Sequence, residues 1–571
     1  MRQLSASSPS WDRKPAIAED RPSFLHGIRH VERCGSLLAI EFSIPEQTRA
    51  MSGGPLLLAW LRPVFLTSSA STGAAVPQPA RQSLPDLASL PPRSLLARIG
   101  TFPFVLAALV VMKIFGFALS GVGDNDIFWH LRNGQFMTAQ HRFPSVDAYS
   151  YTAAGMPWLS HEWLSEFIYY TAFRAFHLQG LWIITAFLPA ITACVMFYLA
   201  FQRSRDPFGA GIATLLGTAL MSVGDGPRMH HFGWLCFVGI FAILQRFRLR
   251  RTGPLWTIPI LFCLWINLHG SWPFGMVIFG LIFLAGFVKE DIGRIQAAPW
   301  TPAERLKLLV TGAASAAAVF INPFGSKLVF YPADLFLHQK LNLDVVQEWR
   351  VLAFSGATGV WVGITLAILL IGTALTGVRW RLDDLALTIL VFYCGFSHER
   401  MFLPAGIILA TVLAPFLTGL SSYDPAQERT RLNLALLAGI LVAMVVLFPS
   451  EKKLQSKIDR TYPLRAVQYL RLHGGRGRLF NEYNWGGYLE WTMPEQRTFI
   501  DSRTDIFEHK GVLREFVDVI RLKHPEKVME KYQIDSVLIT PGTDINVWFD
   551  LQPNWHLAYH DAISAVYVRN P

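Results

Sequence analysis

The stretch that decides the fold of this chain, residues 124–166, reads DNDIFWHLRNGQFMTAQHRFPSVDAYSYTAAGMPWLSHEWLSE. It follows the first long apolar run and is much richer in acids, histidines and tryptophans than the segments around it. Ionisable side chains within a membrane or at its boundary are candidates for function. The candidates in this stretch are Asp124, Asp126, His130, Asp147, His161 and Glu162.

The composition predicts a polytopic α-helical membrane protein rather than a set of soluble domains. Hydrophobic residues make up 52% of the 571 residues and charged residues only 16%, with a mean hydropathy of +0.32. Apolar runs of roughly 15–22 residues recur, as bilayer-spanning helices require. The net charge of +10 comes from Arg and Lys at alternate ends of these runs, which is typical of topology determinants and not of nucleic-acid binding. The five cysteines form no Cys-x-x-Cys pair, so neither a disulfide framework nor a cysteine-based metal site is expected.

The arginine clusters predict about eleven spans, with the N-terminus in the cytoplasm and the C-terminus outside. The first span covers residues 102–121, so the loop 122–180 faces the periplasm or its equivalent. Two apolar stretches, Leu255–Val288 and Leu385–Leu417, carry basic residues at both ends and are therefore expected to fold back as hairpins. The first hairpin has a short first arm, which favours a polar tip buried within the protein.

Three regions of different composition divide the chain. Residues 1–101 are rich in Ser, Pro, Arg and Ala without periodicity, which favours disorder or an over-extended start, with Met51 as an alternative first residue. Residues 102–449 hold the predicted spans. Residues 450–571 alternate between helical and strand patterns, so they are predicted to form a small extracytoplasmic α/β domain with a Rossmann-like alternation.

The expected strands of that domain are residues 478–480, 498–500, 536–540 and 562–568. No Gly-x-Gly-x-x-Gly follows a predicted strand, so dinucleotide binding is not expected.

The Asp-x-Asp pair at the start of the outer loop admits two interpretations. Asp124 and Asp126 can supply a general base or metal ligands if the backbone turns them toward one point. They can also simply cap the amphipathic segment Ile127–Gln135, because Asp is favoured before a helix. The nearby His161-Glu162 pair is not a zinc-protease signature, since HExxH would require a histidine where the chain has Ser165.

Basic side chains gather at two further outer span ends. These are Arg228 with His230 and His231, and His398 with Glu399 and Arg400. Arginine offers bidentate hydrogen bonds to phosphate, so both places suit a phosphate or pyrophosphate group. The alternative for the second is an internal pair between Glu399 and an arginine that ties helices together. His269, in the first hairpin tip, has a similar alternative as a helix–helix hydrogen-bonding group.

Six short motifs follow one another from about residue 100 to the C-terminus. They are Asp-x-Asp-x-x-Trp-His-Leu-x-x-Gly at 124–134, Trp-x-x-x-x-Trp-Leu at 158–164, Asn-x-His-Gly at 267–270, Asn-Pro-x-Gly at 322–325, Trp-Gly-Gly-Tyr-Leu at 485–489 and Asp-x-Arg at 501–503. With the predicted spans and outer loop, they resemble the GT-C class of membrane glycosyltransferases, and more narrowly a group of bacterial multi-pass proteins similar to that class.

The resemblance implies a reaction and its partners. In the GT-C class an acidic residue of the first outer loop is the catalytic base on an acceptor hydroxyl, and the donor is a polyprenyl-phosphate sugar. This implies sugar transfer on the outer face of the cytoplasmic membrane to a glycan, lipid or protein acceptor, with Asp124 or Asp126 as the base. No cofactor is assigned, although a divalent cation is left open. The expected substrate contacts are His130, His161, Glu162, Arg228, His269, His398 and Arg400; the two arginines are nominated by topology, as phosphate contacts.

Two other functions fit the sequence. A transporter or flippase of a lipid-linked substrate would use the polar hairpin tips, and it would move its substrate without chemical change. A non-catalytic envelope-assembly protein would bind a partner through residues 450–571, and it would keep its function when both aspartates are replaced.

Overall fold

The computed structural model of this protein describes residues 95–118, 123–224, 226–345, 349–473 and 477–570. The described residues belong to one compact unit. Most of the predicted tail 1–101, including Met51, lies outside the described residues, and its last part forms the short helix α1 (Leu95–Ile99). The predicted domain boundaries stay a prediction.

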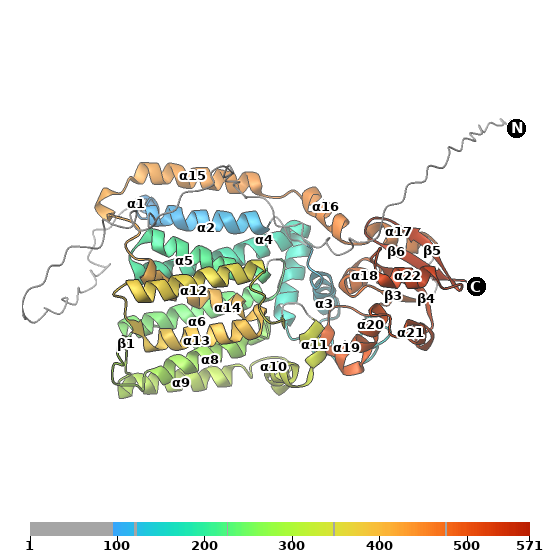
Figure 1. Ribbon diagram of the computed structural model, residues 1–571, viewed down its shortest axis with the longest axis horizontal. Coiled ribbons are helices and arrows are strands. Elements are labelled where there is room, and N and C mark those ends of the chain that lie inside the picture. The colour runs from blue at the N-terminus through green and yellow to red at the C-terminus, as the bar shows by residue number, and fades with distance from the viewer. Residues whose placement is uncertain (1–94, 119–122, 225, 346–348, 474–476, 571) are drawn as a thin grey trace, which may run out of the picture. The chain divides into compact units, whose positions relative to one another are not determined.

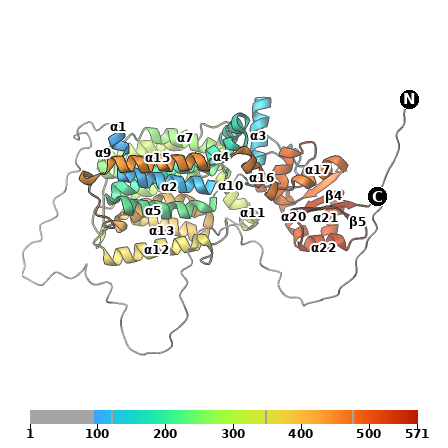
Figure 2. The same ribbon diagram turned by 90° about the horizontal axis from the view of Figure 1, so that it is seen from above.

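Each predicted span coincides with a helix, and these helices lie side by side as a bundle in Figures 1 and 2. Helix α15 packs on α2, which packs on α4 and α5. By length and composition five described helical segments can cross a membrane, so the chain is a multi-pass membrane protein, whereas the count of eleven spans stays a prediction. The helices found at the predicted spans are α2 (Phe102–Ala118), α4 (Trp163–Ser204), α5 (Pro207–Leu220), α6 (His230–Arg250), α7 (Thr257–Leu268), α8 (Trp272–Ala285), α9 (Pro302–Ala318), α12 (Ala357–Leu375), α13 (Leu382–Ser397), α14 (Phe402–Leu413) and α15 (Thr430–Leu447).

Helix α4 consists of two parts that meet at a sharp bend, which Figure 1 shows. The backbone is non-helical at Phe176 and His177. The second part begins where a carboxylate satisfies its free N–H groups, because Glu451 accepts hydrogen bonds from the backbone of Leu178 (3.0 Å) and Gln179 (3.2 Å). The first part, called the outer part after the predicted orientation of loop 122–180 (the outer loop), therefore belongs to that loop, and the second part is the predicted second span.

The outer loop packs helix α3 (Ile127–Gln140) against the outer part of α4. The two helices approach so closely that a Cβ on Gly134 would lie 2.4 Å from Cβ of Tyr170 and 2.6 Å from the carbonyl oxygen of Glu166. Only glycine fits there, which accounts for the last position of the first motif.

The first apolar hairpin is formed by α7 and α8, as predicted. Helix α7 has 12 residues and is about 18 Å long, shorter than a hydrocarbon core of about 30 Å. Its polar tip lies within the protein, where His269 is half-buried beside Ser271. Further elements of the membrane part include α10 (Ser326–His338), α11 (Lys340–Val345), the 3-10 turn η4 (Glu399–Met401) and the short strands β1 (Ile295–Gln296) and β2 (Trp380–Arg381).

The arginine-rich end of the bundle holds a buried ion-pair cluster that the sequence did not predict. Arg248 on α6 is fully buried and contacts two acids of α13, with Nε 2.5 Å from Asp383 and Nη2 2.6 Å from Asp384. Arg203 on α4 also pairs with Asp384 at 2.6 Å. Some of the predicted topology charges therefore join three helices, α4, α6 and α13.

The C-terminal segment forms a four-stranded mixed sheet flanked by helices. The sheet order is β3-β4-β6-β5. Strand β3 is parallel to β4, and β6 is antiparallel to both of its neighbours, β4 and β5. Its strands are β3 (Arg478–Asn481), β4 (Ile534–Ile539), β5 (Trp555–His560) and β6 (Ala565–Arg569). Its helices are α16 (Glu451–Thr461), α17 (Leu464–His473), α18 (Gly486–Thr492), α19 (Thr504–Lys510), α20 (Val512–Ile520), α21 (Pro525–Lys531) and α22 (Asp544–Asp550).

Two details of the predicted sheet are wrong. The mixed strand directions exclude a Rossmann-like parallel sheet, and the edge strand β5, in which only Trp555 is buried, was not predicted. The predicted strand 498–500 is absent from the sheets of the described chain. Instead, Thr498 makes an isolated bridge with Ser150 of the outer loop.

Candidate active site

A cavity of about 750 Å³ opens where the outer loop, the first hairpin tip, α10 and the C-terminal segment meet. Six of the nine predicted site residues line it: Asp126, His130, His161, Glu162, His269 and Arg400. Asp124, Arg228 and His398 are not among the described residues that line it. The prediction did not include several polar lining residues of α10 and the C-terminal segment, among them Tyr331, Tyr483, Arg503 and Asp505.

The two acids of the Asp-x-Asp pair have different surroundings. Asp124 is buried, and its carboxylate accepts one hydrogen bond from the backbone N–H of Asp126 (3.0 Å) and one from Nε of Arg228 (2.5 Å). Asp126 lines the cavity instead. Within the described residues its side chain makes no capping hydrogen bond to α3, so the capping interpretation is wrong for this position.

Three histidines surround the carboxylate of Glu162 on the cavity wall. Its Oε1 lies 3.2 Å from Nε2 of His269 and 3.9 Å from Nε2 of His161, and its Oε2 lies 3.6 Å from Nε2 of His130. Burial raises the pKa of the Glu162 carboxyl above its ordinary 4.5, against the lowering influence of the charges on His161 and His130. Glu162 is therefore easier to protonate than an exposed glutamate.

The tautomer of His269 follows from its neighbours. The backbone N–H of Ser271 donates to Nδ1 of His269 at 3.1 Å, so Nδ1 acts as an acceptor. A neutral imidazole then carries its proton on Nε2, from where it donates to Glu162. This contact joins the tip of the first hairpin to the residue that precedes α4, so the alternative of a helix–helix hydrogen-bonding role stays open for His269.

His130 is held between two carboxylates. Its Nδ1 lies 3.0 Å from Oε1 of Glu166, on the outer part of α4. Glu166 also accepts hydrogen bonds from Asn133 (3.1 Å) and Ser160 (2.5 Å). Burial alone would lower the pKa of His130, but the hydrogen bond to Glu166 and the nearby carboxylate charges outweigh it, so the pKa lies above its ordinary 6.5.

Arg400 brings a positive charge to the cavity beside Trp349. Its guanidinium lies 5.4 Å from the centre of the Trp349 ring, within the range of a cation–π contact. His398 contacts the same residue from another side, since its Nδ1 lies 2.7 Å from the Trp349 carbonyl oxygen. His398 therefore contacts the backbone of Trp349, whose ring makes the cation–π contact with Arg400.

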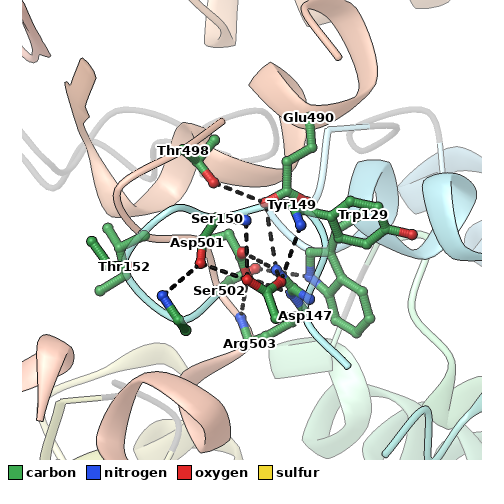
Figure 3. Close-up of polar contacts among 12 residues, drawn as sticks. Trp129, Asp147, Tyr149, Ser150, Thr152, Glu490, Thr498, Asp501, Ser502 and Arg503 are labelled. Atoms are coloured by element: carbon green, nitrogen blue, oxygen red, sulfur yellow. Dashed lines mark hydrogen bonds and ion pairs between the residues drawn. The ribbon is translucent and has the colours of Figure 1, made fainter. Parts of the chain in front are cut away.

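The C-terminal segment contributes Arg503, whose ion pairs cross from that segment to the outer loop (Figure 3). Nη2 of Arg503 lies 2.5 Å from Asp501 and 2.8 Å from Asp147, and the guanidinium lies 4.9 Å from the centre of the Trp158 ring. Burial would raise the pKa of Asp501, but Arg503 outweighs it and holds the pKa below 3.8. In Glu490, 3.7 Å from Arg503, burial raises the pKa well above 4.5.

The second glycine of the Trp-Gly-Gly-Tyr-Leu motif, Gly487, brings α18 against the outer loop. A Cβ on Gly487 would lie 3.1 Å from both the carbonyl oxygen of Asn125 and the Trp129 ring. In addition, Trp129 donates a hydrogen bond from Nε1 to Ser502 at 3.0 Å. The C-terminal segment therefore packs directly beside Asp126.

The cavity joins this polar wall to an apolar lining inside the bundle. The apolar side chains come from α6, α8, α10, α13 and α14, and they include Phe237, Phe274, Val329, Leu390 and Leu403. Indole rings of Trp129, Trp158 and Trp272 line the polar part. A ligand that fills this cavity is therefore amphipathic, with one polar and one hydrocarbon portion.

Among the described residues, no group of three or more His, Cys, Asp or Glu side chains is arranged to hold a metal ion. The cluster at Glu162 is consistent with this, because the Nε2–H of His269 points at the carboxylate and has no lone pair to give. We therefore derive no step through a divalent cation.

No protein-family model and no curated protein sequence matches this chain. Solved structures do: the oligosaccharyltransferase AglB of Archaeoglobus fulgidus in complex with an inhibitory peptide and a dolichol-phosphate matches with a TM-score of 0.45 and 12% identity, over 76% of this chain and 68% of AglB. ArnT from Cupriavidus metallidurans bound to undecaprenyl phosphate matches with a TM-score of 0.45 and 13% identity, over 81% of this chain and 96% of ArnT. Both are GT-C glycosyltransferases, the class that the sequence motifs resemble.

Proposed function

We propose that this protein is a membrane glycosyltransferase that transfers a sugar from a polyprenyl-phosphate-linked donor to an acceptor on the outer face of the cytoplasmic membrane. The observation that carries the proposal is the cavity itself, which joins a carboxylate, Asp126, and a guanidinium, Arg400, to an apolar lining in the bundle. A lipid-linked sugar has the same division into a polar head and a hydrocarbon chain.

Asp126 is the proposed base on the acceptor hydroxyl. It lines the cavity, whereas Asp124 is occupied by Arg228. General-base catalysis by a positioned carboxylate typically contributes about 10²–10⁴-fold to the rate. The resemblance to the GT-C class left these two acids equivalent, and their different surroundings support Asp126.

Arg400 is the proposed contact of the donor phosphate. A guanidinium can form two parallel hydrogen bonds to phosphate oxygens and stabilises the negative charge that develops as the sugar–phosphate bond breaks. Its contact with Trp349 supports a fixed position. We assign His161 and Tyr331, whose rings stack at 4.4 Å on the cavity wall, to the sugar portion of the donor or to the acceptor.

The test compares two sugar donors for the purified protein in lipid nanodiscs: a polyprenyl-phosphate-linked sugar and the same sugar on a water-soluble nucleotide. The proposal expects radiolabel to reach a lipid, glycan or peptide acceptor from the lipid-linked donor alone. Uptake of the unchanged donor into proteoliposomes, without transfer, would instead identify a transporter. Binding of an envelope partner with neither transfer nor uptake would identify an assembly protein.

A further inference from the structure

The hydrogen bonds around His130 fix one of its two ring protons. Oε1 of Glu166 faces Nδ1 of His130 at 3.0 Å and already accepts a hydrogen bond from the side-chain amide of Asn133. Two facing lone pairs would repel, so the proton of this contact belongs to Nδ1. Ser160 contacts the other Glu166 oxygen at 2.5 Å, which keeps the carboxylate in place.

The second ring nitrogen of His130 therefore faces Glu162 with either a proton or a lone pair. With Nδ1 protonated, neutral His130 presents the Nε2 lone pair to Oε2 of Glu162 at 3.6 Å. Two lone pairs then face each other across a buried contact, and a single added proton converts the repulsion into an attraction. Such contacts are often long in unliganded sites and shorten when the ligand binds.

The side chains of His130 and Glu162 are placed to receive a proton from the cavity. Asp126 and His130 are one turn apart at the start of α3, and the backbone N–H of His130 donates to the Asp126 carbonyl oxygen at 3.1 Å, so their side chains share one face. Glu162 reaches the same cavity from the start of α4, and Asp126, His130 and Glu162 all line it.

We propose that Glu162 and His130 form a proton-accepting pair that holds the proton released by the acceptor hydroxyl. This inference rests on the proposed function. The acceptor O–H bond breaks while its oxygen bonds to the anomeric carbon of the sugar, and the bond from that carbon to the donor phosphate breaks with its electron pair on the phosphate. The proton passes by way of Asp126 to the space between Oε2 of Glu162 and Nε2 of His130, which restores Asp126 as a carboxylate.

The surrounding charges tune this pair. His269 donates to Glu162 from the hairpin tip, His161 lies 3.9 Å from Glu162, and Tyr331 of α10 stacks on His161. Arg400 from η4 and His161 both favour the carboxylate form of Glu162, and Asp126 favours the protonated form of His130. Glu166 also favours protonated His130, through its hydrogen bond. The pair is thus flanked by positive groups on the Glu162 side and by acids on the His130 side.

The test is a pH titration of the full-length protein in nanodiscs by infrared difference spectroscopy, following the carbonyl stretch of protonated carboxyl groups. Three proteins are compared with wild type: Glu162→Gln, His130→Asn and the exposed control Glu495→Gln. Asn keeps a donor for Glu166 at the place of Nδ1 and removes Nε2, so His130→Asn tests the shared proton alone. We expect one carboxyl band to disappear in Glu162→Gln and to change its midpoint in His130→Asn, while Glu495→Gln keeps it.

The inference is overturned if the Glu162 band keeps the same midpoint in wild type and His130→Asn. In a transfer assay, Glu162→Gln should lower turnover at least tenfold and remove one limb of the pH–rate profile, with donor binding retained. Unchanged turnover with an unchanged pH profile would also overturn it. If wild type transfers no sugar, the proposed function fails, but the titration still decides whether the pair shares a proton.

Discussion

Nη2 of Arg503 lies 2.8 Å from Oδ1 of Asp147, a carboxylate 356 positions earlier in the chain. Both side chains are almost completely buried, and the pair connects the C-terminal segment to the outer loop that carries Asp126. Asp147 also accepts hydrogen bonds from the backbone N–H and the hydroxyl of Ser150, which fixes the turn of the loop at these residues. The C-terminal segment is thus part of the cavity wall and contributes to its geometry.

Replacing Arg503 by methionine should destabilise the protein and loosen the outer loop. The change leaves Asp147 and Asp501 buried without their partner, a loss that costs about 3–5 kcal/mol in comparable buried pairs. A fall in melting temperature and faster hydrogen exchange across residues 145–160 are expected. The exposed Arg521→Met provides the matched control, and equal melting temperatures for the two variants would contradict the role given to Arg503.

Asp124→Asn should lower the stability of the folded protein rather than the rate of sugar transfer. The substitution weakens the charge-assisted hydrogen bond from Arg228 and leaves that guanidinium without its carboxylate, at a cost of about 1–3 kcal/mol. Thermal unfolding in detergent measures the effect. The same substitution at Asp126, which lines the cavity, is expected to change the melting temperature less; the opposite order would count against the assignment.

Arg248→Met should destabilise the bundle at its arginine-rich end. Asp383 and Asp384 would lose the partner that joins α6 to α13, and removing one member of a buried charge network costs about 3–5 kcal/mol. Arg246→Met, two residues away and exposed, is the control. Size-exclusion profiles after heating report the difference, which should be absent if the cluster contributes nothing to stability.

The stability of the folded protein should carry a pH dependence that comes from His130. Its pKa is raised in the fold, so the folded state binds the proton more tightly than the unfolded state does. The contribution of His130 is therefore complete below its ordinary 6.5 and is lost as pH rises through the higher folded value. Melting temperatures between about pH 6 and pH 9 should fall less steeply in His130→Asn than in wild type. His524→Asn, at an exposed left-handed helix cap that Asn tolerates, should keep the wild-type slope.

The helices could be predicted from the sequence because their signals are local. Apolar runs and arginine clusters located every helix of the bundle, and the excess of basic residues at both ends of Leu255–Val288 correctly indicated a hairpin. The exact ends of the helices were harder to predict. The bend at Phe176 and His177 depends on Glu451, which caps the second part of α4 and lies far away in the sequence.

The choice between the two aspartates could not be made from the sequence. Asp124 and Asp126 are chemically equal and two residues apart, and what separates them is Arg228, which lies 104 positions further along the chain. The partners of Glu162 present the same problem, because His269 reaches it from the hairpin tip. Thr498 shows the opposite failure: its β-branched segment predicted a strand of the sheet, yet its bridge is made with the outer loop.

The measurement that tests the account most directly is sugar transfer by Asp126→Asn and Asp124→Asn, compared with wild type at equal amounts of folded protein. The donor is a polyprenyl-phosphate-linked sugar, and both the glycosylated acceptor and the released polyprenyl phosphate are quantified. We predict that Asp126→Asn lowers the transfer rate by about 10²–10⁴-fold while donor binding persists. The transfer rate per folded molecule of Asp124→Asn should stay within about tenfold of the wild-type rate. Full activity of Asp126→Asn would contradict the account.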